Sequence, residues 1–304
     1  MYKLASVISM ATLLGACAVG PDYQAPAPVP LEQYTHEQSA ESVPERALPG
    51  NEQLFWQGFE DPLLAQLIEQ TLLGNQSLQA SLARYQEAAA LLRGTRRNQL
   101  PSVTAGAGVA GQRLAEVERT QPDEQRVELY QAGVALSWEL DLFGRLRRAT
   151  EASEAELQAA GADQQTLQVA LAGQLASSYF QLRGLQQQLR VAEENVALQQ
   201  ASLQIVDARL EAGRGTLFDQ VRARAQLDAT RAAIPELQAA MGAAMHRIGV
   251  LTGHPPTALN SLLAVPEGLP VASPMIAAGS PGDVLRRRPD IQAAERPVAV
   301  ASAR

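Results

Sequence analysis

The sequence predicts a mainly α-helical chain that contains one long antiparallel helical hairpin and one β-hairpin. Three observations lead to this fold class. A glycine-rich reversal, Gly213-Arg214-Gly215-Thr216, separates two helical stretches. Apolar and polar side chains alternate between Tyr130 and Leu142, as in a strand with two different faces. Apolar side chains also recur every seven residues, as in a coiled-coil seam, at Leu175, Leu182, Leu189, Val196, Leu203 and Leu210.

The composition argues against several classes of function. The 304 residues carry a net charge of -7, and the one basic cluster is Arg286-Arg287-Arg288, so nucleic acid is not expected as a partner. A single cysteine excludes an internal disulfide, and the three histidines are too scattered in sequence to suggest a metal site. No Ser/His/Asp set or phosphate loop is apparent. We therefore expect no catalytic residues, no metal and no cofactor, and the chain is not expected to be an enzyme.

The N-terminus is predicted to be a secretory signal followed by a lipid-anchored tether. Residues 1–16 contain Lys3, an apolar segment and a small pair before Cys17, and this end resembles a bacterial lipobox. Cleavage before Cys17 would leave that thiol to be acylated, and Ala18 after it resembles signals for the outer membrane. The alternative is a plain signal peptide with an incidental cysteine. Residues 17–53 are rich in proline and are expected to form an extended tether.

The next segments are predicted to be a helix over 61–100 and two strands over 102–111 and 127–143. In the second strand, Tyr130 and Trp138 share the apolar face and stand about 26 Å apart, close to the height of the apolar band of an outer-membrane barrel. We expect both aromatic residues at the barrel rims. The opposite face carries the residues expected toward the lumen, namely Gln131, Glu139 and Asp141. The alternatives are a half-buried hairpin of a soluble α+β domain and, for Glu139, a rim salt bridge.

The helical hairpin is predicted to consist of a long helix over 144–212 and a return helix over 217–252. No proline interrupts the first helix, which would extend for roughly 100 Å. A helix of this length must cross a gap or form the wall of a tube, although a dimeric coiled coil with a solvated outer face is the alternative. A linker over 253–284 follows. Residues 285–304 weakly repeat the first helical segment and are expected to begin a second repeat.

Four stretches together resemble the TolC-type outer-membrane efflux channels, in the lipoprotein branch that serves RND multidrug pumps. They lie in the family's order along nearly the whole chain, and jointly they are highly specific although no single one is. The stretches are Leu14-Gly15-Ala16-Cys17-Ala18-Val19-Gly20-Pro21-Asp22-Tyr23, Ser137-Trp138-Glu139-Leu140-Asp141-Leu142-Phe143-Gly144-Arg145, Ala212-Gly213-Arg214-Gly215-Thr216 and Leu285-Arg286-Arg287-Arg288-Pro289-Asp290.

The resemblance implies an outer-membrane channel subunit that exports drugs or other small molecules passively. In that family three protomers build one β-barrel in the outer membrane and one α-helical tunnel in the periplasm. The resemblance makes Cys17 the lipidated residue and residues 54–284 one efflux repeat. It also makes Gly213, Arg214, Gly215 and Thr216 the periplasmic tip where a periplasmic adaptor, or membrane fusion protein, docks and connects the channel to an inner-membrane RND pump.

The sequence departs from the family pattern after the first repeat. The second strand pair and the second helical hairpin are missing, and with them the region where the family carries its acidic constriction. We therefore expect a C-terminally truncated chain, with assembly from twice as many short protomers as an alternative. Two rival functions stay open: a lipid-anchored periplasmic coiled-coil adaptor or structural protein without a pore, and a non-functional fragment.

Overall fold

The computed structural model describes residues 20–27, 55–56, 58–118, 126–270 and 280–304. The chain divides into two compact units, which we describe separately. The hairpin unit comprises residues 1–27, 84–161 and 293–304, and the core unit comprises residues 28–83 and 162–292. The predicted signal peptide over 1–16, Cys17 and residues 28–53 of the predicted tether lie outside the described residues. Among the helices that the structure describes, none is both long and apolar enough to cross a membrane.

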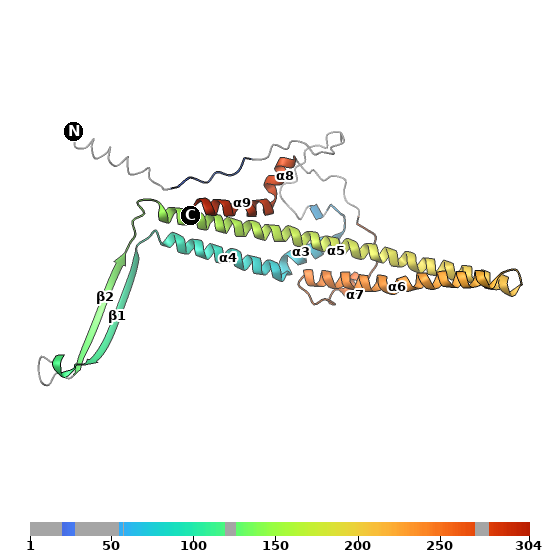
Figure 1. Cartoon of the computed structure of the whole chain (residues 1–304), viewed down its shortest axis with the longest axis horizontal. Helices are drawn as coiled ribbons and strands as arrows, with labels where there is room; N and C mark the ends of the chain where they lie inside the picture. The colour runs from blue at the N-terminus through green and yellow to red at the C-terminus, as the bar shows by residue number, and fades with distance from the viewer. Residues whose placement is uncertain (1–19, 28–54, 57, 119–125, 271–279) are drawn as a thin grey trace. The chain divides into compact units, whose positions relative to one another are not determined.

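The hairpin unit contains a two-stranded antiparallel sheet between two helices. Helix α4 (Gln76–Arg97) leads into β1 (Ser102–Arg113), and β2 (Arg126–Ser137) leads toward α5 (Arg145–Glu211). The strands pair from Ser102 opposite Ser137 to Arg113 opposite Arg126. Figure 1 shows them side by side as a ribbon that is continuous with the end of α4 and the start of α5. A 3₁₀ turn, η1 (Glu116–Glu118), follows β1.

A small apolar cluster closes the helical part of the hairpin unit. The C-terminal part of α9 (Pro289–Ser302) packs on the early turns of α5, with Tyr23 against the same cluster. Alanine side chains allow this close approach, because they leave little bulk between the two helix backbones. The buried members are Ala152, Ala155, Ala299, Val300 and Ala303.

The core unit is built from helices that share one apolar core. Helix α3 (Pro62–Gly74) begins where Asp61 accepts a 2.9 Å hydrogen bond from the Leu64 amide, and Pro62 occupies its first position. The return helix α6 (Leu217–Leu251) continues through Pro235. The core also takes in the short α7 (Asn260–Leu263). Its fully buried apolar side chains are Leu64, Leu67, Leu175, Tyr179, Leu182, Ile248 and Leu263.

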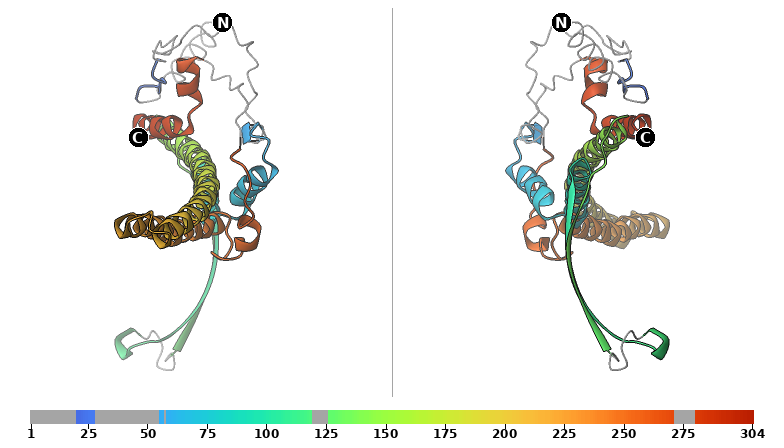
Figure 2. Two further views of the ribbon diagram at one scale, coloured as in Figure 1. Left: turned by 90° about the vertical axis from the view of Figure 1, so that its right-hand side faces the viewer. Right: turned by 90° about the vertical axis from the view of Figure 1, so that its left-hand side faces the viewer.

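The predicted coiled-coil seam faces α6. Leu175 and Leu182 are completely buried, and the seam residues from Leu189 to Leu210 are half-buried along the distal part of α5. Gln220 donates a hydrogen bond to Asp207 and Arg231 donates one to Gln200, which joins the two helices side by side. All the views in Figures 1 and 2 show α6 following the C-terminal part of α5. The predictions of a mainly helical chain, a long helical hairpin and one β-hairpin are confirmed.

Several element boundaries differ from the sequence predictions. The helix expected over 61–100 is two helices, because Asn75 ends α3 and begins α4. The first strand extends to Arg113, two residues beyond its predicted end. The second strand stops at Ser137, six residues before its predicted end at 143. The helix expected from residue 285 begins earlier, as α8 (Pro281–Arg287), and Arg288 separates it from α9.

Candidate functional site

The β-hairpin has one apolar face, because directly opposite residues on paired strands share a face. The register places Val103 opposite Leu136, and Val109 opposite Tyr130. We call this surface the apolar face. It consists of Val103, Ala105, Ala107 and Val109 on β1 with Tyr130, Ala132, Val134 and Leu136 on β2. The alternation of apolar and polar positions in β2 is thus matched in β1, although β1 by itself consists mainly of small, β-permissive residues.

The apolar face is exposed to an unusual degree. Val103 is 67% exposed, Val134 is 75% exposed and Tyr130 is 69% exposed. The opposite face carries mostly small and polar residues, among them Thr104, Gly108 and Gln131, with Val127 and Leu129 near the loop end of the hairpin. A two-stranded ribbon with this much exposed aliphatic surface is poorly matched to water. Contact with lipid on one face and with a polar lumen on the other suits both faces.

Three of the residues predicted on the second strand lie beyond its end. Trp138, Glu139 and Asp141 fall in the segment between β2 and α5, so their placement on the strand was wrong. The cause is local hydrogen bonding at the start of α5. Asp141 accepts hydrogen bonds from the amides of Leu146 (3.1 Å) and Arg147 (3.0 Å), which caps the helix instead of extending the sheet.

The other two residues are also engaged at the base of the hairpin. Arg145 Nη2 donates to both carboxylate oxygens of Glu139 at 2.7 Å, and Arg145 Nε donates to Glu139 Oε1 at 3.1 Å, so the two side chains form a charge-assisted ion pair. The indole nitrogen of Trp138 donates a 3.2 Å hydrogen bond to the Gln99 carbonyl, and its side chain is 57% exposed. Glu139 therefore takes part in the salt bridge that the sequence left open as an alternative.

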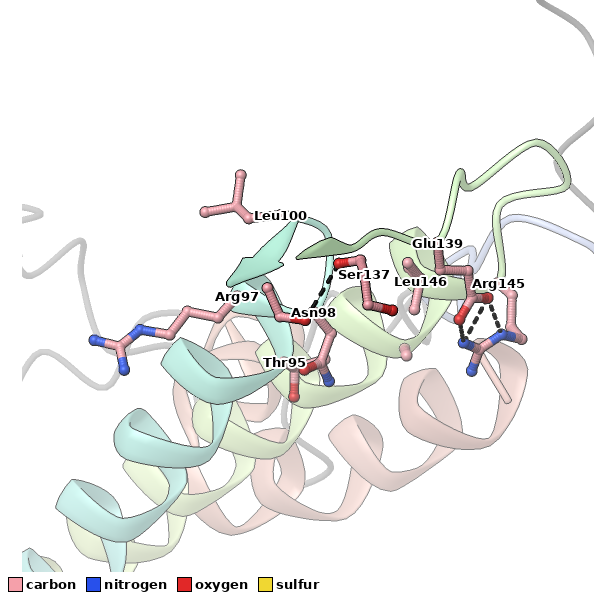
Figure 3. A pocket seen from close by; sticks show the side chains of 10 residues that line it. Thr95, Arg97, Asn98, Leu100, Ser137, Glu139, Arg145 and Leu146 are labelled. Carbon is pink, nitrogen blue, oxygen red and sulfur yellow. Dashed lines mark hydrogen bonds and ion pairs between the residues drawn. The ribbon is translucent and has the colours of Figure 1, made fainter. Parts of the chain in front are cut away.

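A pocket of about 310 Å³ lies at this base, between the end of α4 and the start of α5 (Figure 3). The Glu139–Arg145 pair forms one side of it, and Arg97 and Leu100 lie on the other side, directed away from that pair. Ser102 and Ser137 line it between these sides, and the Ser102 hydroxyl donates to the Ser137 carbonyl. The pocket combines hydroxyl, amide and guanidinium groups with one exposed leucine.

The reversal between α5 and α6 is a well-capped tight turn. Gly213 has a φ of +70°, and the Arg214 amide donates back to the Arg209 carbonyl, which satisfies the end of α5. Thr216 and Asp219 form a capping box at the start of α6. Gly213, Arg214 and Thr216 are exposed and Gly215 is half-exposed. Figure 1 shows this turn at the far end of the α5–α6 pair.

The structure adds exposed apolar residues that the sequence reasoning missed. Leu217 and Phe218, directly after the turn, are 65% and 71% exposed. A second line on α5, made of Val191, Leu198 and Ile205, repeats every seven residues and is exposed. The same spacing that marked the seam could have identified this line. It leaves α5 with an apolar stripe that α6 does not cover.

The N-terminal segment is attached to the start of α5 and to α9. Arg148 donates a 2.8 Å hydrogen bond to Asp22 and a 3.0 Å hydrogen bond to the Gly20 carbonyl. The Tyr23 hydroxyl donates a 2.6 Å hydrogen bond to Glu295, which together with burial raises the pKa of Tyr23. We call residues Gly20 to Tyr23 the strap. In the described part of the chain, no three His, Cys, Asp or Glu side chains could jointly hold a metal ion.

Comparison with known proteins adds a family match. The family model described as "Outer membrane efflux protein" matches residues 67–254. Nodulation protein T of Rhizobium leguminosarum bv. viciae is 30% identical over 302 residues, which cover 99% of this chain and 60% of that protein. The pyoverdine export outer membrane protein OpmQ of Pseudomonas putida is 33% identical over 271 residues, which cover 88% of this chain and 57% of that protein. The chain thus spans about 60% of the length of such relatives.

Solved structures give the same result. The outer-membrane channel OprN is similar with a TM-score of 0.82 and 40% sequence identity, over 94% of this chain and 63% of that one. CusC, described as undergoing conformational changes with folding and transmembrane channel formation, is similar with a TM-score of 0.73 and 26% identity, over 94% and 62%.

Proposed function

Because this chain belongs to the outer membrane efflux protein family, we propose that it is the outer-membrane channel subunit of a tripartite efflux system. It would conduct drugs or other small molecules passively from the periplasm of a Gram-negative bacterium to the outside. The observation that supports this most directly is the hairpin, whose two strands pair with their apolar residues on one shared, exposed face. A membrane barrel has this alternation, with lipid outside and a polar lumen inside.

The polar face of the hairpin is proposed to line the lumen. Gln131 lies on that face, opposite Gly108. Glu139 and Asp141 are proposed at the periplasmic mouth and not within the barrel wall, since both are held against the start of α5. Tyr130 and Trp138 remain candidates for the two aromatic rims, and both side chains are exposed.

The turn at Gly213–Thr216 is proposed to dock a periplasmic adaptor, through which an inner-membrane RND pump would be connected. The exposed guanidinium of Arg214 and the apolar side chains of Leu217 and Phe218 offer such a partner both charge and buried area. The uncovered stripe of Val191, Leu198 and Ile205 is proposed to face the helices of a neighbouring protomer, as a homotrimeric tunnel requires.

Cys17 is proposed to carry the lipid anchor. It precedes Gly20 by three residues, so the covalent chain limits its distance from the strap to about 11 Å. The strap is bound to the first turns of α5, next to the base of the hairpin. An acyl chain on Cys17 would therefore start close to the membrane surface that the hairpin meets. Mass spectrometry of membrane fractions tests this, since an unmodified N-terminus would contradict it.

Planar-bilayer recordings on purified protein test the channel. We expect ion conductance, and we expect it to respond differently to arginine at two adjacent positions. Val134→Arg places a charge on the apolar face. This should destabilise the inserted state by about 2–4 kcal/mol near a bilayer midplane and abolish insertion. Ala135→Arg points to the opposite face and should insert while shifting ion selectivity toward anions. Absence of conductance in the unchanged protein would favour the adaptor or structural role instead.

A further inference from the structure

The end of α4 carries two arginines that no carboxylate among the described residues balances. Arg96 pairs with Glu154 at 2.6 Å, whereas Arg93 and Arg97 have no ion pair or hydrogen-bond partner for their side chains among the described residues. At the start of α5 each arginine is neutralised locally: Arg145 by Glu139, Arg147 by Asp141 and Arg148 by Asp22 and Glu151. The excess positive charge at the base of the hairpin is therefore confined to one side of α4.

The two free arginines lie on a line that leads to the apolar face. Arg93 and Arg97 are four residues apart and share one side of α4. Leu100 lies just beyond the helix, in a turn closed by a 2.9 Å hydrogen bond from its amide to the Arg97 carbonyl, and such a turn keeps residues three apart on one side. Leu100 is 64% exposed, and Val103, the first residue of the apolar face, is 67% exposed. Two cations are thus followed by a continuous exposed aliphatic surface.

The pocket beside this line offers uncharged donors. Arg97, Asn98 and Leu100 all line it, and the side-chain amide of Asn98 has no partner in the described structure. A basic last turn also suits the helix dipole, but that effect falls off within one turn and does not account for Arg93. A ligand that fits these features needs a phosphate for the guanidinium groups, hydroxyl or carbonyl oxygens for the amide, and hydrocarbon for Leu100.

We propose that Arg93, Arg97 and the adjoining pocket bind the headgroup phosphate of an anionic phospholipid in the periplasmic leaflet of the outer membrane. The acyl chains would lie along Leu100 and the apolar face, so the lipid would set the depth at which the hairpin sits. This rests on the proposed function, because it requires the hairpin in a bilayer with its base at the headgroups. Each guanidinium near a headgroup layer strengthens binding by about fivefold.

Native mass spectrometry of the detergent-purified full chain, titrated with phosphatidylglycerol or phosphatidylcholine, tests this site. We expect the protein to retain phosphatidylglycerol more tightly than phosphatidylcholine. The double variant R93Q/R97Q should weaken the binding of phosphatidylglycerol by more than tenfold and leave the binding of phosphatidylcholine unchanged. The charge-preserving R93K/R97K should stay within about threefold of the unchanged protein. The matched control R222Q/R224Q removes two exposed arginines from α6 and should change nothing.

The possible failures separate the two proposals. Equal retention of both lipids, or loss in R222Q/R224Q as large as in R93Q/R97Q, overturns the lipid site while the channel stands. Displacement of phosphatidylglycerol by millimolar inorganic phosphate also overturns it, because the site would then recognise free phosphate. Failure of the unchanged chain to enter vesicles of either composition removes the channel proposal and this site with it.

Discussion

Arg183 and Glu267 join the middle of α5 to the segment that follows α7: Arg183 Nη2 donates a 2.8 Å hydrogen bond to Glu267 Oε2. The arginine side chain is completely buried although it carries a charge. Its guanidinium also donates to the Val265 carbonyl at 2.7 Å, to Gln186 at 2.9 Å and to the Tyr179 hydroxyl at 3.0 Å. Burial raises the pKa of Tyr179, which keeps the phenol protonated and able to donate to Asp61.

Replacing Arg183 with methionine should destabilise the core unit by about 2–4 kcal/mol. The aliphatic length is kept, but the Val265 carbonyl and the Gln186 amide oxygen lose a buried charged donor. Denaturant unfolding of detergent-purified protein, followed by far-ultraviolet circular dichroism, measures the loss. Arg190→Met, on an exposed turn of the same helix, should change stability by less than about 0.5 kcal/mol. Equal effects of the two changes would contradict the role given to Arg183.

Asn75 is expected to stabilise two elements at once. Its Oδ1 accepts from the Ser77 amide at the start of α4, and its Nδ2 donates a 2.9 Å hydrogen bond to the Leu251 carbonyl at the end of α6. Asn75→Ala removes both hydrogen bonds and should lower the free energy of unfolding by about 2–3 kcal/mol. Asn75→Ser keeps a capping acceptor and should lower it by about 1 kcal/mol. The same unfolding experiment ranks the two variants. A serine variant as unstable as the alanine variant would assign the whole effect to the Leu251 contact.

The backbones of Gly74 and Gly253 approach so closely that neither position accepts a side chain. Gly253 has a φ of +78°, and a Cβ there would lie 2.2 Å from the Gly74 carbonyl oxygen. Gly253→Ala should therefore destabilise the protein by more than about 2 kcal/mol. Gly242, within α6, has open space where its Cβ would be, so Gly242→Ala should stabilise by about 0.5–1 kcal/mol. Opposite signs in the unfolding free energy would establish the contact, and a neutral Gly253→Ala would refute it.

The sequence predicted the parts of the fold that depend on periodic patterns. The seven-residue spacing identified the seam of α5, and strict alternation identified the apolar face of β2. It also predicted the start of α3, since Asp61-Pro62 is a strong helix signal. These patterns are local, so they are visible without knowing which elements meet.

Features that depend on distant partners were not predictable in this way. The alternation over Trp138–Leu142 continued past Ser137, but Asp141 is used to cap α5 and ends the strand early. Arg183 resembles a surface residue on a polar helix, because its partners Val265 and Glu267 are 82 and 84 residues away. The contact between Tyr23 and Glu295 joins residues 272 apart. The sequence left two roles for Glu139, a position facing the lumen or a salt bridge, because its partner Arg145 lies just beyond the predicted end of the strand.

The strap is expected to detach when the Tyr23 hydroxyl can no longer donate. Folding raises the pKa of this phenol, mainly through its hydrogen bond to Glu295. The hydrogen bond therefore stabilises the attached strap fully below the ordinary tyrosine pKa near 10, and this stabilisation is lost as pH rises through the raised pKa. Tyr23→Phe should detach the strap at neutral pH, whereas Glu295→Gln keeps an acceptor and should largely retain it. Limited proteolysis within residues 20–27, with N-terminal sequencing of the products, measures this. A strap equally protected in Tyr23→Phe and in the unchanged protein would show that Asp22 and Arg148 hold it without the phenol.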